Sequence, residues 1–519
     1  MMEAENIKGG DFDFMEYHEK RRESGVLLPV FSLPGPYGIG CFSRYARQWL
    51  DFLAAAGQSC WQILPLGPTG YGDSPYQSFS TFAGNPYFID LEELIRRGAL
   101  TPQDCECLTP DNASRVDYKT LYEKRPPLLR RAFANGDSPH DPDFLRFCAE
   151  NARWLDDYAL FMALKNDSGG KPWTEWPEAL RLRRHDALER VRTELSGEIA
   201  FHKRAQYEFF RQWDALREYA HGRGIRIIGD IPIYVAMDSA DAWANPELFQ
   251  LDAENRPTAV AGCPPDGFSA VGQLWGNPLY RWDYHKETGY RWWMERLKAA
   301  FRLYDVLRID HFRGFDEYYA IPYGETTAIH GEWRPGPGLD FFRAMERNLG
   351  RREVIAEDLG YVTESVRRLV RDSGFPGMKV LQFAFDSRDT GSAADYLPHN
   401  YPTNSVAYTG THDNETAAGW LRNIKPEELR QVREYLCDDY TPDAELSRPF
   451  VSLAMGSPAR LCVIPLQDYM GLDNSCRTNR PSSVGENWLW RVREDALSDS
   501  LRRNIADVTR RYGRFQEIG

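Results

Sequence analysis

Residues 305–314 read DVLRIDHFRG, a short apolar segment that ends in charged side chains. Its aliphatic residues are typical of a buried β-strand. Arg308 and Asp310 interrupt them two positions apart, so in a strand these two side chains point to the same face. A buried ion pair contributes little net stability to a fold. The stretch therefore predicts a buried strand whose carboxyl end carries functional side chains.

The pattern of a helix, a glycine-containing stop and a short apolar strand recurs along the chain. In EFFRQWDALREYA, residues 208–220, apolar side chains fall at helical spacing, and HGRG and the strand IRIIGDIPIYV follow. TESVRRLVRDSG opens with a threonine suited to cap a helix and leads to another strand. Eight strands are predicted, within residues 25–34, 58–70, 225–235, 305–310, 353–360, 378–386, 405–414 and 461–471.

Strands that alternate with helices predict right-handed βαβ units and a parallel sheet. Eight such units predict an α/β fold of the (β/α)8 or TIM-barrel class, with residues 1–519 forming a single catalytic domain. A doubly wound open sheet is the alternative, and it is less favoured because no glycine-rich dinucleotide turn follows the first strand.

Two long stretches do not fit the simple repeat. Residues 90–200 separate the second and third strands, and we predict that they form an inserted, mainly helical subdomain over the catalytic face. Residues 236–288 are rich in Gly, Pro and Trp, and we predict a substrate-loop insertion of shaped turns after the third strand.

Bulk composition argues against several functional classes. The 519 residues are 42% hydrophobic and 27% charged, with a net charge of −13, which argues against a nucleic-acid partner. The nine cysteines are odd in number and have no disulfide-framework spacing, as expected of reduced thiols. No signal peptide is visible, and no apolar run approaches the roughly 18 residues that cross a membrane. We expect a cytoplasmic protein without a membrane partner.

Polar residues at the carboxyl ends of the strands are the candidates for chemistry, because a TIM barrel carries its active site there. Carboxylates placed together repel one another, so structure alone does not require them. The residues at these ends are Asp230 in the third strand, Arg308, Asp310 and His311 in the fourth, Glu357 and Asp358 in the fifth, and His412 and Asp413 in the seventh.

Paired carboxyl groups suit cleavage of a glycosidic bond with retention, which needs two of them about 5 Å apart. Arg308 favours the charged form of Asp310, as a nucleophile requires. Glu357 lies one strand over, where like charge and partial burial would raise its pKa and suit a general acid/base. Asp413 could accept hydrogen bonds from sugar hydroxyls and hold a distorted ring.

Plainer interpretations stand beside this one. Arg308 and Asp310 could be a structural pair in the barrel core. His311 and His412 are reasonable donors to sugar hydroxyls, but either could be a packing residue or a metal ligand. A metal site is less favoured because no HxH or HExxH spacing occurs, and we predict none.

Aromatic side chains gather on the loops after the second and third strands. Aromatic rings cover the apolar faces of sugars well, so as a group they favour an extended carbohydrate groove. Gln273 and Asn277 offer polar contacts in the same region. The loop aromatics are Tyr71, Tyr76, Phe79, Phe268, Trp275, Tyr280 and Trp282.

Several segments, in order, resemble motifs of the 4-α-glucanotransferases, also called amylomaltases or disproportionating enzymes, which form glycoside hydrolase family 77 in the α-amylase clan. The resemblance runs from about residue 25 to about residue 495. The segments are SLPGPYGIG, GDSPYQSFSTFAGNPYFIDLE, GDIPIYV, CPPDGFSAVGQLWGNPLYRW, RIDHFRGF, AEDLG, GTHDN and NWLWR.

The resemblance implies a (β/α)8 barrel with inserted subdomains and no C-terminal β-domain. It implies Asp310 as nucleophile, Glu357 as acid/base and Asp413 as transition-state stabiliser. It places Arg308, His311 and His412 around the cleaved bond, and Tyr76, Asp230, Gln273 and Trp275 at substrate-binding positions. The implied reaction moves a 1,4-α-glucan segment between maltooligosaccharides through a covalent intermediate, without a cofactor.

Other functions stay open at this point. An α-glucan hydrolase of the same clan would need the same acids, a non-catalytic glucan-binding protein could use the same groove, and a metal-dependent barrel hydrolase is a remote third. The chain departs from the family pattern at Gly267, where relatives often carry an aromatic, and at Ser482. Monomer or homo-oligomer is left undecided.

Overall fold

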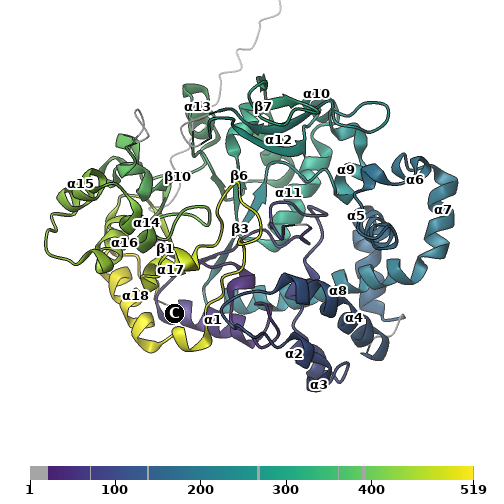
Figure 1. The fold of residues 1–519 in the computed structure, drawn as a ribbon, viewed down its shortest axis with the longest axis horizontal. Coiled ribbons are helices and arrows are strands. Elements are labelled where there is room, and N and C mark those ends of the chain that lie inside the picture. Colours follow the sequence, from purple (N-terminus) through teal and green to yellow (C-terminus); the bar gives the residue numbers. More distant parts are fainter. Residues whose placement is uncertain are drawn as a thin grey trace, which may run out of the picture.

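Eight parallel strands close into a barrel at the centre of the computed structural model (Figure 1). The structure describes residues 22–70, 72–136, 140–265, 269–360, 362–387 and 393–517. In barrel order the strands are β1 (Glu23–Leu27), β12 (Leu461–Pro465), β11 (Ser405–Tyr408), β10 (Gly377–Val380), β9 (Val354–Ala356), β6 (Val306–Asp310), β3 (Arg226–Pro232) and β2 (Cys60–Gln62). The predicted TIM barrel is confirmed, and the open-sheet alternative is wrong.

Each strand is shorter than the apolar segment that predicts it. The segment at 405–414, for example, pairs only over Ser405–Tyr408, and its polar end forms a loop. The helices around the barrel include α1 (Arg44–Ala55), α11 (Arg291–Leu303), α12 (Leu339–Leu349), α13 (Glu364–Ser373), α14 (Ala417–Asn423), α15 (Pro426–Leu436), α16 (Ser447–Gly456), α17 (Leu466–Met470) and α18 (Asp499–Arg511). The Thr363 side chain caps α13 as predicted, and Gly374 ends it in the left-handed region at φ 72°.

Helices fill the range between β2 and β3 and lie to one side of the barrel (Figure 1). Helix α5 packs along the first part of α8, whose last turns lead into β3. Whether residues 90–200 form a separate subdomain stays a prediction. The helices are α2 (Leu91–Arg96), α3 (Pro102–Cys105), α4 (Tyr118–Gly136), α5 (Pro142–Asp167), α6 (Glu178–Arg181), α7 (His185–Glu194) and α8 (Ser196–Gly222).

The stretch at 236–288 contains regular structure, so the expectation of shaped turns was wrong, whereas the substrate-loop insertion itself stays a prediction. It holds α9 (Ala240–Ala244), α10 (Trp282–Glu287) and two antiparallel strands, β4 (Ala259–Cys263) and β5 (Gln273–Pro278). These strands join β7 (Glu317–Pro322) and β8 (Glu332–Pro335), which follow β6, in a sheet of order β5-β4-β7-β8. The pairing of β4 with β5 and with the distant β7 overrides the local glycine and proline signal.

The C-terminal segment closes the amino-terminal end of the barrel. Arg514 is 1% exposed, and its guanidinium donates to the carbonyl oxygens of Glu23, Met455, Ser457, Ala459 and Arg460 at 2.8–3.0 Å. Beyond Pro465, the described residues form helices and loops but no strand. Among the described residues, no helix is both long and apolar enough to span a membrane.

Candidate active site

The carboxyl end of β6 holds a guanidinium between two carboxylates. Parallel pairing of β3 and β6 sets Asp230 beside Arg308. Arg308 Nη1 donates to Asp230 Oδ2 at 2.6 Å, and Nη2 lies 3.0 Å from Asp310 Oδ1. The side chains of Asp230 and Arg308 are 0% and 3% exposed, whereas that of Asp310 is 28% exposed. The ion pair therefore anchors Asp310 from below and leaves its carboxylate accessible.

Tyr76, in the loop after β2, covers the buried end of this cluster. Its hydroxyl donates to Asp230 Oδ2 at 2.9 Å. Burial raises the pKa of Asp230, and the charge of Arg308 acts against that rise. The Asp230 side chain has no surface exposed to solvent. Its contacts with Arg308 and Tyr76 hold those two side chains in place.

Glu357 follows β9, the next strand beyond β6. Ile309 pairs with Ala356, so Asp310 and Glu357 stand at the same level on strands that lie about 4.8 Å apart. The Glu357 carboxyl accepts the backbone N–H of His311 at 2.7 Å and that of Leu359 at 3.0 Å.

Burial raises the pKa of Glu357 to about 8, and the negative charge of Asp310 adds to the rise. Arg308 and the two backbone N–H groups act in the opposite direction but do not cancel it. At neutral pH the site therefore holds one protonated carboxyl group beside Asp310.

His311 turns the chain sharply at the end of β6. Its backbone is in the left-handed region at φ 54°, which is uncommon for a residue with a side chain. Burial lowers its pKa to about 4, so the ring is neutral. The Trp275 ring meets His311 edge-on with centroids 4.8 Å apart, and the Trp275 indole N–H donates to Gln273 Oε1 at 3.1 Å. Strand β5 of the small sheet thus contributes directly to the cluster.

The loop after β11 brings His412 and Asp413 to the opposite side. The His412 ring stacks on Tyr76 with centroids 5.1 Å apart and an interplanar angle of 13°. Burial lowers the pKa of His412, although the charge of Asp413 works against this. The Asp413 side chain is 42% exposed, and its Oδ1 lies 3.3 Å from His412 Nε2.

Two residues that sequence reasoning missed hold Asp413. Asn479 Nδ2 donates to Asp413 Oδ1 at 2.6 Å, and Arg477 Nη2 donates to the Asp413 carbonyl oxygen at 2.5 Å. Both lie after β12 in RTNRPSSVGEN, a stretch noted only for Ser482. No local pattern identifies them, because their partners lie more than sixty residues away in the chain.

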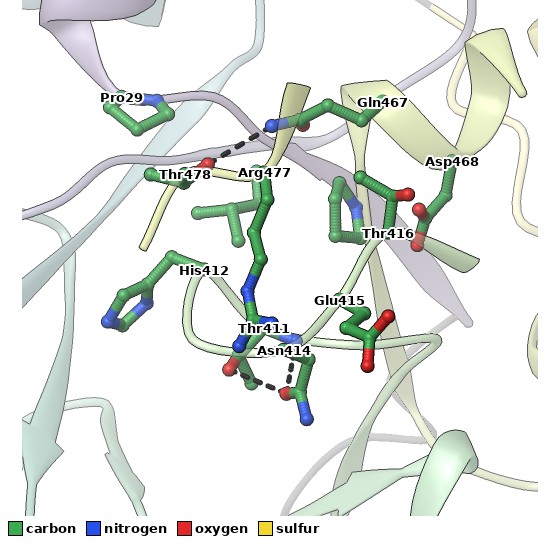
Figure 2. Close-up of a pocket in the computed structure, with 12 residues that line it drawn as sticks. Pro29, Thr411, His412, Asn414, Glu415, Thr416, Gln467, Asp468, Arg477 and Thr478 are labelled. Carbon is green, nitrogen blue, oxygen red and sulfur yellow. Dashed lines mark hydrogen bonds between the residues drawn. The ribbon is translucent and has the colours of Figure 1, made fainter. Parts of the chain in front are cut away.

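A small polar pocket lies behind this loop, and Figure 2 shows Arg477 extending across it toward Thr411 and Asn414. Thr411 donates to Asn414 Oδ1 at 2.8 Å, and Gln467 donates to Thr478 Oγ1 at 3.1 Å. The loop that carries Asp413 is therefore held by the Thr411–Asn414 hydrogen bond within it and by Arg477 from outside it.

Not every predicted residue joins the cluster. Phe268, Tyr71 and Gly267 lie outside the described residues. Tyr280 is a packing residue, 1% exposed, whose hydroxyl donates to the Ile233 carbonyl. Asn277 is likewise buried and bonds Val235, and Asp358 accepts the backbone N–H of Met378 at 2.8 Å. Two of the loop aromatics do join the cluster: Tyr76 contacts Asp230, and Trp275 contacts His311.

Comparisons with known proteins agree on one family. A family model described as 4-alpha-glucanotransferase matches residues 28–497. The 4-alpha-glucanotransferase of Clostridium butyricum is 46% identical over 492 residues, 94% of this chain and 100% of its own. That of Thermus thermophilus is 48% identical over 505 residues, 95% of this chain and 100% of its own.

A solved structure shows the same architecture. Amylomaltase from Streptococcus agalactiae, determined in complex with acarbose, superposes with a TM-score of 0.92 at 41% identity, covering 96% of this chain and all of its own. The chain therefore belongs to the 4-alpha-glucanotransferase family and is a glycosyltransferase enzyme of that type.

Proposed function

We propose that this enzyme transfers a segment of a 1,4-α-D-glucan to the 4-hydroxyl of glucose or of a second maltooligosaccharide, by double displacement with retention. One observation carries the proposal: Asp310 and Glu357 stand side by side on β6 and β9 in opposite electrostatic surroundings. That difference separates a nucleophile from an acid. The similar amylomaltase from S. agalactiae, solved with acarbose, supports a glucan-like ligand for the same fold.

In the first displacement, the Asp310 carboxylate attacks the anomeric carbon and forms a covalent glycosyl ester. Glu357 gives its proton to the departing 4-oxygen, so the shortened glucan leaves as a neutral alcohol. Arg308 holds Asp310 by one N–H at 3.0 Å and sets its direction of attack. Glu357 ends this step as a carboxylate, stabilised by two backbone N–H groups.

In the second displacement, the Glu357 carboxylate takes the proton from the acceptor 4-hydroxyl. With that proton Glu357 is again a neutral acid; the acceptor oxygen bonds to the anomeric carbon as the bond to Asp310 breaks, and the electron pair of that bond returns to the Asp310 carboxylate. Asp413, half-exposed and held by Asn479, accepts hydrogen bonds from the hydroxyls of the distorted ring. The catalytic groups therefore return to their starting protonation states.

The remaining site residues bind the sugar. His311 and His412 are neutral because burial lowers their pKa, so each donates a hydrogen bond without placing a cation next to an oxocarbenium-like ring. Tyr76, Gln273 and Trp275 line the cluster around them. Asp230 acts through Arg308 and Tyr76, and Phe268 stays a prediction as a substrate-binding residue.

Maltotriose tests the function directly. Transfer converts it to glucose and a ladder of maltodextrins longer than the substrate, which thin-layer chromatography and mass spectrometry resolve. Products limited to glucose and maltose would show that water resolves the intermediate and would make the enzyme a hydrolase. No turnover by the intact protein on maltotriose or longer maltodextrins would leave only glucan binding.

A further inference from the structure

Arg308 makes a third contact that has no role in the two displacement steps. Its Nη1 and Nη2 groups serve Asp230 and Asp310, and its Nε–H donates to the thioether sulfur of Met378 at 3.4 Å. Both side chains are buried, Met378 at 1% exposure and Arg308 at 3%. A nitrogen-to-sulfur distance of this size is that of a hydrogen bond to a weak, neutral acceptor.

Met378 also contacts the residue next to Glu357 in the chain. Its backbone N–H donates to Asp358 Oδ1 at 2.8 Å, and Asp358 directly follows Glu357. Strands β9 and β10 are paired at one position, Gly377 with Ala356. The hydrogen bond between Met378 and Asp358 therefore adds a second connection between these two segments. A Cβ at position 377 would lie 2.5 Å from Asp358 Oδ2, and this keeps the position a glycine.

We propose that Met378 is a positioning residue for the nucleophile: its sulfur fixes the third edge of the Arg308 guanidinium, so that Nη2 stays directed at Asp310. The proposal rests on the function proposed above. A thioether suits the place because it accepts a hydrogen bond without carrying charge. A third carboxylate there would pull Arg308 away from Asp310 and repel the nucleophile.

An apolar side chain of similar size at this position would leave the Nε–H buried without an acceptor. An unsatisfied buried donor is costly, and rotation of the guanidinium toward another acceptor relieves that cost. Such a rotation moves Nη2 away from Asp310 Oδ1. The defect would therefore appear in the chemical step and leave sugar binding almost unchanged.

The variants Met378→Leu and Met378→Gln test whether Met378 acts as a hydrogen-bond acceptor or only as a packing residue. Leu keeps the apolar volume but removes the acceptor, while Gln packs less well but offers a carbonyl oxygen. With maltotriose we expect kcat of the Leu variant to fall about 10-fold with KM within twofold, and the Gln variant to retain more kcat than Leu. Met345→Leu on α12, another buried methionine, is the matched control and keeps wild-type kcat.

A maltosyl donor with fluoride as leaving group shows which half of the site is affected. Fluoride needs no proton from Glu357, so a defect that acts through Arg308 and Asp310 persists with this donor. Thermal unfolding checks that each variant is folded. If the Gln variant does not fold, the kcat of the Leu variant with the fluoride donor tests the proposal by itself.

Three results would overturn the proposal: wild-type kcat in Met378→Leu, more kcat for Leu than for a folded Gln variant, or recovery of the Leu variant with the fluoride donor. The last would place the effect on the Glu357 side. Failure of the proposed function looks different, since the unmodified enzyme would then give no product ladder from maltotriose.

Discussion

Each end of the barrel holds an arginine between two carboxylates, yet the two clusters have different surroundings. At the amino-terminal end, Arg226 lies 2.8 Å from Glu23 and 2.9 Å from Glu353, and these side chains are 22–30% exposed. At the carboxyl end, Arg308 and Asp230 are 3% and 0% exposed. Solvent screens the first cluster, and burial strengthens every interaction in the second.

The balance of charge differs as well. Arg460 lies 3.8 Å from Glu353, so two arginines face two carboxylates at the amino-terminal end. At the carboxyl end, the single charge of Arg308 serves Asp230 and Asp310, with Glu357 beside them. A proton on Glu357 reduces this excess negative charge but leaves one carboxylate more than there are cations. A balanced, half-exposed cluster supports the fold, whereas an unbalanced, buried one prepares an acid next to a nucleophile.

Asp310→Asn should give the largest effect, because it removes the attacking atom while keeping the size of the side chain. We expect kcat on maltotriose to fall by about 10,000-fold or more. Glucan affinity, measured by calorimetry with the same substrate, should change little. Turnover that survives the substitution would mean that another carboxylate is the nucleophile.

Glu357→Gln should lower kcat by roughly 100- to 10,000-fold, because the leaving oxygen loses its proton donor. In the unsubstituted enzyme, kcat/KM should fall as pH rises above about 8, where Glu357 loses its proton. A pH–rate profile on maltotriose checks this, and a profile that stays flat to pH 10 would assign the acid to another residue.

The same substitution should raise stability at alkaline pH. The native protein holds the Glu357 proton up to about pH 8, whereas an unfolded chain releases it near pH 4.3. Between these values the native state binds more protons, so wild-type stability falls as pH rises through the window. Gln does not titrate. Denaturant unfolding measures the free energy of unfolding of both proteins at pH 5 and pH 8. Relative to the wild type, the free energy of Glu357→Gln should be higher at pH 8 than at pH 5. The same difference between the two proteins at both pH values would contradict this.

Arg514→Met tests the amino-terminal end without touching the site. The substitution removes the buried guanidinium that donates to five carbonyl oxygens, and we expect a loss of about 3 kcal/mol in the free energy of unfolding. Below the unfolding transition, kcat should equal that of the wild type. A loss of kcat in the folded variant would show that the two ends of the barrel are coupled.

Sequence pattern predicted the barrel because each of its strands is a short apolar segment before a helix, as in the stretch around Arg308. It also predicted which strand ends carry carboxylates, since Asp310 is the last residue of β6 and Glu357 directly follows β9. It did not predict β4 and β5, of which β4 pairs with β7 beyond β6, nor Asn479 and Arg477, whose partner Asp413 is distant in the chain. Local spacing carries no information on such long-range pairings.

Arg226→Met and Arg308→Met make the same change at the two ends, and the pair gives the sharpest form of the comparison. Arg226 is 30% exposed and its partners remain solvated. We therefore expect Arg226→Met to lower the free energy of unfolding by about 1 kcal/mol or less and to leave kcat unchanged. Arg308→Met leaves Asp230 buried without its cation and releases Asp310, so activity should be lost. Maltotriose turnover and denaturant unfolding of both variants check this. If Arg226→Met also lowered kcat in the folded protein, charge balance and exposure would not separate supporting clusters from catalytic ones in this barrel.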